Sequence, residues 1–425
     1  MKLCIRGGRL IDPANHIDTI TDIYISDGKI THIGESNSHT AEQTIDAKGL
    51  VVCPGLVDLS VSLPEPGKQQ KGSISTETRA AAAGGITSIC CLPDTAPVID
   101  SASVATLIQD LARQGGFCNV WPIGALTQGL LGEQLSEMGT LKDAGCIGMS
   151  NLRAPFANSR VLLRCLEYAS SYDVTVFFNA IDHALADDGC VHEGSFATRL
   201  GLKGIPETAE TVALTRDLLL IEQTGVRAHF GQLSCARSVA LVAEAQAKGF
   251  LVTADVCIHH LLATDSSIQN FNSLNHIQPP LRTETDRQAL IKGVQDGVIT
   301  AICSHHQPHE TAAKMAPFAA TEPGISGLDT LLAQGLQLVN QDLLELSDLI
   351  ARLTSGPARA AKIKAGSLAA GDIADICVFD PSEQWQVSSD SLHSKGQNTP
   401  LMGQTLKGRV RHTILAGRPI FPQQP

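Results

Sequence analysis

Histidines in two short clusters are the residues of this sequence whose types and spacing could do metal chemistry. His259 and His260 are adjacent, and His305 and His306 are followed by His309 after two other residues. Neutral imidazole is a common zinc ligand. A bound zinc ion lowers the pKa of its water enough to supply a nucleophile near neutral pH. The two clusters could therefore, in principle, assemble a hydrolytic metal site.

The elements that would position these histidines are predicted strands and helices that alternate along most of the chain. The strand predictions include residues 56–61, 86–92, 119–124, 146–149, 174–178, 226–233, 251–256 and 299–303. The helix predictions between them include residues 104–114, 133–142, 160–171, 207–223, 236–248 and 284–295. About eight strand–helix units are the repeat of a TIM-like (β/α)8 barrel. We therefore predict an α/β fold with such a barrel over residues 51–364.

Both ends of the chain have a different pattern. Residues 1–50 contain short strands separated by glycine turns, which is typical of antiparallel sheet, and this pattern returns in residues 365–425. We predict that the two ends share one small β-sandwich domain.

The composition excludes several classes of partner. The formal net charge is −11 and no run of lysine and arginine is present, so nucleic acid and anionic membranes are poor partners. The twelve cysteines are scattered, follow no CxxC pattern and no secretory signal, and are interpreted as reduced buried thiols. No apolar run reaches the roughly 20 residues that span a bilayer. We expect a cytoplasmic protein.

Several motifs occur in the order found in one enzyme family. Residues 54–67 resemble the first barrel strand of dihydroorotases in the amidohydrolase superfamily, which reads Asp-x-His-x-His-x-Arg-Glu-Pro-Gly. Further similar segments are residues 79–87, 200–206, 279–282 and 371–375. The resemblance covers nearly the whole chain. It implies an amidohydrolase barrel flanked by a small β domain, in a family that hydrolyses cyclic amides with a divalent metal, usually zinc.

The first strand of this sequence lacks the residues that the family uses there. Two imidazoles spaced i, i+2 on a strand project to the same side, which suits metal binding. Ser60 and Ser62 occupy those two positions, and Pro64 replaces the arginine that binds the substrate carboxylate. Asp94 replaces the asparagine of the family's Pro-Asn-Thr motif. The resemblance therefore implies that both metal binding and substrate anchoring are lost here.

The remaining family positions are also altered. The metal-binding aspartate or carboxylated lysine after the fourth strand is absent from the segment 150–153, where Leu152 stands in this region. Asn179 and Gln232 replace ligand histidines, Gln278 replaces the asparagine before Pro-Pro-Leu-Arg, and His305 replaces the catalytic aspartate. Serine, asparagine and glutamine form hydrogen bonds but are poor zinc ligands.

An alternative remains open in which His259, His305, His306 and His309 rebuild a metal site. Against it, adjacent residues on a strand point to opposite faces. The resemblance also implies that His259, His306 and His309 stand where working members carry histidines beside their ligands. His305 is the one novel histidine and is either a weak base or a hydrogen-bonding filler. We expect no catalytic residues, metal or cofactor, with zinc only under this alternative.

Three functional hypotheses follow. The resemblance implies a known role for inactive dihydroorotase-like chains, as pseudoenzymes that assemble or stabilise aspartate carbamoyltransferase in de novo pyrimidine biosynthesis. We expect a homo-oligomer or a hetero-oligomer with that catalytic chain. The alternatives are an active zinc-dependent cyclic amidohydrolase and a small-molecule sensor whose pocket is lined by Ser60, Ser62, Asn179 and Gln232.

Overall fold

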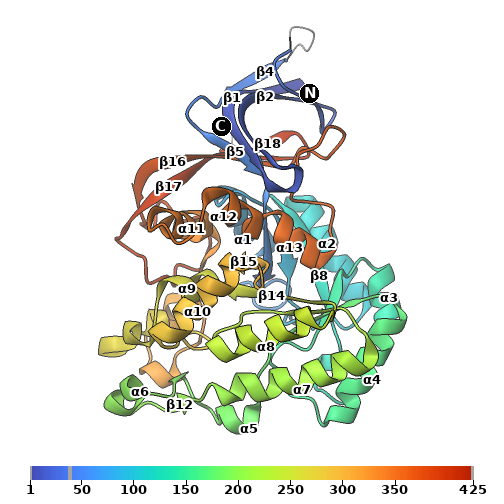
Figure 1. Cartoon of the computed structure of the whole chain (residues 1–425), viewed down its shortest axis with the longest axis vertical. Helices are drawn as coiled ribbons and strands as arrows, with labels where there is room; N and C mark the ends of the chain where they lie inside the picture. The colour runs from blue at the N-terminus through green and yellow to red at the C-terminus, as the bar shows by residue number, and fades with distance from the viewer. Residues whose placement is uncertain (1, 37–40, 423–425) are drawn as a thin grey trace.

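A parallel sheet of eight strands forms the centre of the computed structural model, which describes residues 2–36 and 41–422. The strands are hydrogen-bonded in sequence order from β6 to β15, and this confirms the predicted (β/α)8 barrel (Figure 1). Their bounds are β6 Leu56–Val61, β7 Ile86–Cys91, β8 Asn119–Ala125, β9 Gly148–Ser150, β10 Thr175–Phe178, β13 Ala228–Phe230, β14 Val252–Cys257 and β15 Ala301–Cys303. The short strands β11 (Val191–His192) and β12 (Gly204–Ile205) are not part of this order and pair only with each other.

The barrel closes between its first and last strands. Val61 and His306 form a parallel bridge just beyond β15. The Ser62 N–H donates to the His306 carbonyl at 2.9 Å, and the His306 N–H donates to the Ser60 carbonyl at 3.1 Å. The segment after β15 therefore lies beside the end of β6, which brings its histidines and the two serines to the same edge of the barrel.

Helices surround this sheet (Figure 1). The longer ones are α1 Ile74–Ala83, α2 Ala102–Gly115, α3 Met138–Asp143, α4 Ser159–Ser171, α7 Thr208–Thr224, α8 Ala236–Ala247, α10 Glu284–Gln295, α11 Leu331–Asn340, α12 Leu346–Leu353 and α13 Ser355–Ala361. Capping boxes at Ser73 and Thr283 fix the beginnings of α1 and α10. The predicted helix 133–142 was wrong at its beginning. Leu135 instead forms a bridge with Thr127, so α3 begins only at Met138.

The two ends of the chain form a second, mixed sheet (Figure 1). Its strands are β1 Lys2–Asp12, β2 Ile17–Ser26, β3 Lys29–Ile33, β4 Gln43–Asp46, β5 Val51–Pro54, β16 Ile376–Gln386, β17 Thr405–Leu415 and β18 Arg418–Phe421. The barrel predicted from the sequence includes residues 51–54. They belong to this sheet, because β5 pairs with β1 and with β16. The barrel therefore begins after Pro54 instead of at residue 51.

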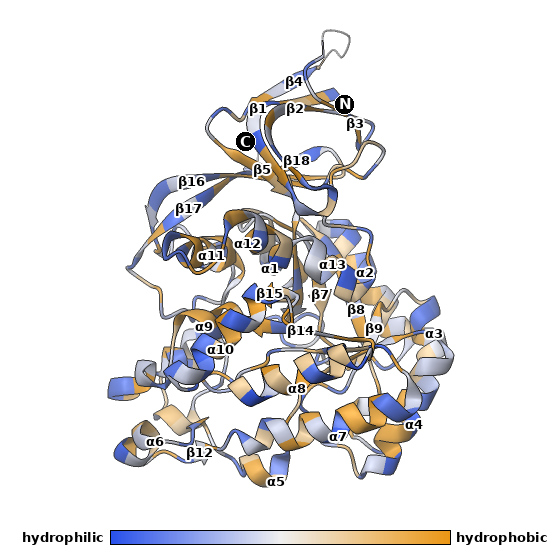
Figure 2. Cartoon of the chain, viewed as in Figure 1, coloured by the Kyte–Doolittle hydropathy of each residue, from blue (hydrophilic) through white to orange (hydrophobic). Residues whose placement is uncertain are grey.

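Apolar residues fill both parts of the fold. Figure 2 shows them concentrated along the central strands, with polar residues spread over the outer helices. A separate cluster that includes Leu3, Ile25 and Ile376 fills the sheet of the chain ends. All twelve cysteines are buried and unpaired, as the sequence predicts. Across the part of the chain that the structure describes, there is no helix with the length and apolar character needed to cross a membrane.

Candidate functional site

The carboxyl ends of the barrel strands bring Ser60 and Gln232 into direct contact. The Gln232 side-chain amide donates to Ser60 Oγ at 2.6 Å. Its carbonyl oxygen accepts a hydrogen bond from Arg153. Two positions where the family resemblance implies metal ligands are thus joined to each other and to a guanidinium group. The neutral Gln232 amide therefore holds the positive charge of Arg153 at the mouth of the barrel, which is the opening at the carboxyl ends of its strands.

Arg153 is the residue of this mouth that the sequence interpretation missed. It follows Leu152, whose backbone has a φ of 51° and whose side chain packs against an apolar cluster that contains Leu59 and Phe177. Arg153 instead lines three cavities at the mouth. Burial lowers the pKa of its guanidinium, although the group stays charged at any physiological pH. In the sequence, the only clue to this role was the position of Arg153 directly after Leu152, which stands where the family has a metal ligand.

Two buried carboxylates, Asp58 and Asp255, hold the backbone of Ser60 and Gln232 in place through hydrogen bonds. Asp255 accepts from the Gln232 N–H at 2.7 Å and contacts His229 Nε2 at 2.9 Å. Asp58 accepts from the backbone N–H groups of Ser60 and Ser304. Burial raises the pKa of Asp58 to about 6, against the opposing effect of these hydrogen bonds. The polar network is therefore built into the base of the mouth.

Ser62, Pro64 and Asp94 line a cavity of about 210 Å³ on one side of the mouth. Ser62 Oγ lies 3.4 Å from Asp94 Oδ2, while Asp94 Oδ1 is buried without a hydrogen-bond partner. Burial raises the pKa of Asp94, and the charges of Lys68 and Arg153 oppose that rise. Asp94 therefore lines this cavity with a carboxylate that the surrounding protein leaves only partly hydrogen-bonded.

Asn179 and Gln278 lie in a neighbouring cavity. Its walls also include Gln232, Arg153 and Arg282. The structure therefore brings the altered family positions together around one mouth, but in two adjoining cavities, with Arg153 and Gln278 lining both.

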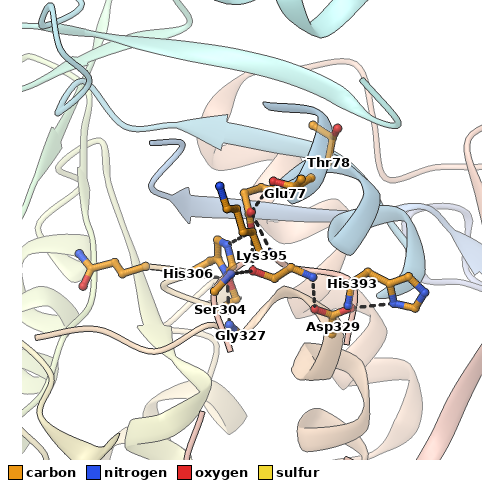
Figure 3. Close-up of polar contacts among 12 residues, drawn as sticks. Glu77, Thr78, Ser304, His306, Gly327, Asp329, His393 and Lys395 are labelled. Carbon is orange, nitrogen blue, oxygen red and sulfur yellow. Dashed lines mark hydrogen bonds and ion pairs between the residues drawn. The ribbon is translucent and has the colours of Figure 1, made fainter. Parts of the chain in front are cut away.

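His306 belongs to a buried network instead of the open mouth (Figure 3). Its Nδ1 accepts from the Gly327 N–H at 3.1 Å, so Nε2 carries the hydrogen that it donates to Glu77 at 2.9 Å. Glu77 also accepts from the Ser394 hydroxyl and the Lys395 N–H. Burial acts to raise the pKa of Glu77, but the hydrogen bonds that it accepts from His306 and Ser394 outweigh it and lower the value. Both partners are fully buried, which is typical of a structural pair.

The other surviving histidines are also tied to the backbone. His259 and His260 lie on the short helix α9 (Ile258–Leu262), so our argument from opposite faces of a strand was wrong for them. Each uses Nε2 to bond a carbonyl, that of Ser304 and of Pro280 respectively, and His309 bonds the carbonyl of Pro323. Burial lowers the pKa to about 3 for His259 and about 4 for His260, so both are neutral.

His305 is buried at the mouth, with a backbone φ of 48°. Its Nε2 has no hydrogen-bond partner. Burial, followed by the charge of Arg153, lowers the pKa of this imidazole well below its usual value, so it is neutral. In residues 2–36 and 41–422, no three histidine, cysteine, aspartate or glutamate side chains are grouped to hold a metal ion. Hydroxyls and amides beside a guanidinium do not fit a zinc ion.

Solved structures with the same fold include a hydantoinase and a dihydropyrimidinase. The L-hydantoinase (dihydropyrimidinase) of Arthrobacter aurescens superposes with a TM-score of 0.89 at 22% identity, over 98% of this chain and 95% of that one. The dihydropyrimidinase of Brevibacillus agri superposes with a TM-score of 0.86 at 21% identity, over 99% and 95% of the two chains. The fold is therefore an amidohydrolase-type barrel, as predicted.

Sequence comparison identifies the family. A model of the dihydro-orotase-like family matches residues 49–238. A "dihydroorotase-like protein" of Pseudomonas aeruginosa is 54% identical over 418 residues, 98% of this chain and 99% of the relative. A "dihydroorotase" of Trichlorobacter lovleyi is 39% identical over 422 residues, 99% of each chain. The chain belongs to the dihydroorotase-like family.

Proposed function

We propose that this chain is a catalytically inactive dihydroorotase homologue that serves as a structural partner of aspartate carbamoyltransferase. The observation that carries the loss of catalysis is the hydrogen-bonded series from Ser60 through Gln232 to Arg153. It fills the mouth with a neutral amide and a fixed cation, where hydrolysis in this family needs a metal ion and a proton-carrying carboxylate.

The loss is distributed over the whole mouth. Restoring one imidazole would leave Arg153 beside the metal position, and the repulsion between two cations would oppose binding. His305 cannot replace the carboxylate as an anionic metal ligand, because an imidazole side chain is neutral or cationic near neutral pH. We infer that no metal and no cofactor is used.

The assembly role is supported by family resemblance together with the retained scaffold. Both sheets are complete, the barrel closes between Val61 and His306, and buried polar networks such as Glu77 with His306 hold its loops. A scaffold maintained without its catalytic groups is what a structural subunit requires. We propose that this chain forms a hetero-oligomer with the transferase chain.

Co-expression with aspartate carbamoyltransferase tests the assembly role. We expect the two chains to co-purify and to give a light-scattering mass above that of either chain alone. We also expect the transferase to assemble less completely when this chain is omitted. Separate elution of the two chains, with transferase assembly unchanged by omission, would contradict the proposal.

The competing function is that of an active zinc-dependent cyclic amidohydrolase. The features that favour it are the two unpartnered imidazole nitrogens, His260 Nδ1 and His305 Nε2. Two nitrogens fall short of the three protein ligands that catalytic zinc sites normally have. We therefore keep this reading as the alternative.

A further inference from the structure

The cavity beside the end of β6 is lined by charged groups that the assembly role does not use. It measures about 210 Å³, and its walls include Ser62, Lys68, Asp94 and Arg153. A water molecule occupies about 30 Å³ in the liquid. The space therefore has room for a small-molecule ligand such as an amino acid.

Two cations face this cavity with donors to spare. The Lys68 ammonium group forms no ion pair or hydrogen bond with another described residue. Arg153 has five N–H donors, and its side chain bonds only Gln232 among the residues that the structure describes. Each cation is thus available to one anionic group of a ligand.

Asp94 supplies the opposite charge. Its Oδ1 atom is buried with no partner, and its Oδ2 atom has a long contact of 3.4 Å with Ser62. Asp94 forms no ion pair with Lys68 or Arg153 in the described part of the chain, although all three line the same cavity. Asp94 as a whole is half-buried and lines the cavity, so the carboxylate can still accept a hydrogen bond from a ligand N–H group.

The remaining charged pair at the rim neutralises itself. Lys71 lies 3.5 Å from Glu322, and its ammonium group also contacts His309 Nδ1 at 3.2 Å. The charges left for a ligand are therefore two positive groups and one negative group. The complementary molecule carries two anionic groups and one cationic N–H donor.

We propose that this cavity binds a small acidic α-amino acid, with its two carboxylates held by Lys68 and Arg153 and its ammonium group donating to Asp94. The proposal goes beyond the assembly role and stands without it, because it needs only the folded chain. It also differs from the pocket of Ser60, Ser62, Asn179 and Gln232 considered from the sequence, since the Ser60 and Gln232 side chains bond each other.

Calorimetric titration of the full chain with L-aspartate and L-glutamate tests the proposal. We expect saturable binding of at least one of them, at least roughly tenfold tighter than binding of succinate, which lacks the ammonium group, and of L-alanine, which lacks the second carboxylate. No saturable binding of either acidic amino acid would overturn the proposal. Succinate binding as tightly as L-aspartate would assign a plain anion site and would overturn it too.

Variants assign the individual contacts. We expect Asp94→Asn to weaken binding of the acidic amino acid at least roughly tenfold while leaving succinate within about twofold. Lys68→Met should weaken the acidic amino acid and leave L-alanine unchanged. Lys48→Met, at an exposed lysine far along the chain from these residues, is the matched control and should change neither. Unchanged affinity in both Asp94→Asn and Lys68→Met, with wild-type thermal unfolding, would contradict the assignment.

Discussion

Two regions of the barrel, the buried network around Glu77 and the open mouth, treat buried polar groups in opposite ways. In the network, Glu77 and His306 are fully buried, and each uses its charged or polar atoms in hydrogen bonds (Figure 3). At the mouth, Asp94 and Arg153 line a cavity; Asp94 Oδ1 has no hydrogen-bond partner among the described residues, and the Arg153 side chain bonds only Gln232. Satisfied networks rigidify a fold, whereas unsatisfied groups cost stability unless a ligand completes them. The Glu77 network therefore maintains the scaffold, and the cavity lined by Asp94 and Arg153 is where we expect a ligand to bind.

The largest effect is expected in the Glu77 network. Glu77→Ala removes the acceptor for His306, Ser394 and the Lys395 N–H and leaves these donors buried. We expect the free energy of unfolding to fall by about 3–5 kcal/mol in urea titrations. The matched control is Glu322→Ala, whose carboxylate is 58% exposed in its pair with Lys71 and should cost less than about 1 kcal/mol. Equal losses of unfolding free energy in Glu77→Ala and Glu322→Ala would contradict the view that the buried Glu77 network stabilises the scaffold.

Asp58, a hydrogen-bonded carboxylate at the base of the mouth, gives a pH-dependent effect. Its pKa of about 6 in the folded protein lies above the usual value of 3.8, so the folded state binds the proton more tightly than the unfolded state. Stability from this group therefore falls as pH rises from 3.8 to about 6 and is constant above that. Asp58→Asn lacks this dependence. The free energy of unfolding of the variant minus that of the wild type should therefore rise by about 2–3 kcal/mol between pH 4 and pH 7. Parallel urea-midpoint curves for the two proteins would contradict this.

A smaller effect of opposite sign is expected at the cavity of the mouth. Asp94→Asn removes a buried charge whose Oδ1 atom has no partner. We expect the free energy of unfolding without ligand to rise by about 0.5–1 kcal/mol, measured by urea titration at pH 7.5. A loss of stability in this variant would mean that Asp94 serves the scaffold, and the contrast between the two regions would disappear.

Much of the barrel could be predicted from the sequence because strands and helices alternate with clear periodicity. Helix α10 was predicted with the bounds that the structure has, Glu284–Gln295, and a capping box at Thr283 stabilises its beginning. The altered positions Ser60, Ser62 and Gln232 were found because they fall within ordered family motifs. Those motifs place residues on known strands, and strand ends in a barrel meet at one mouth.

The contacts within the mouth could not be predicted in this way. Arg153 enters it because Leu152 adopts a left-handed backbone conformation and turns the chain, which no periodicity reveals. The partner of Glu77 lies more than two hundred residues away, at His306, so only the closed barrel brings them together. The short helix at His259 and His260 was mistaken for strand because its apolar run is too short to show a helical period.

Metal analysis of the complete chain, purified without chelator and with zinc in the growth medium, tests the central claim that this mouth no longer performs metal-dependent hydrolysis. The account predicts only trace zinc and no hydrolysis of dihydroorotate above the buffer rate, in wild type and in His305→Ala alike. Stoichiometric zinc together with turnover that His305→Ala abolishes would contradict it.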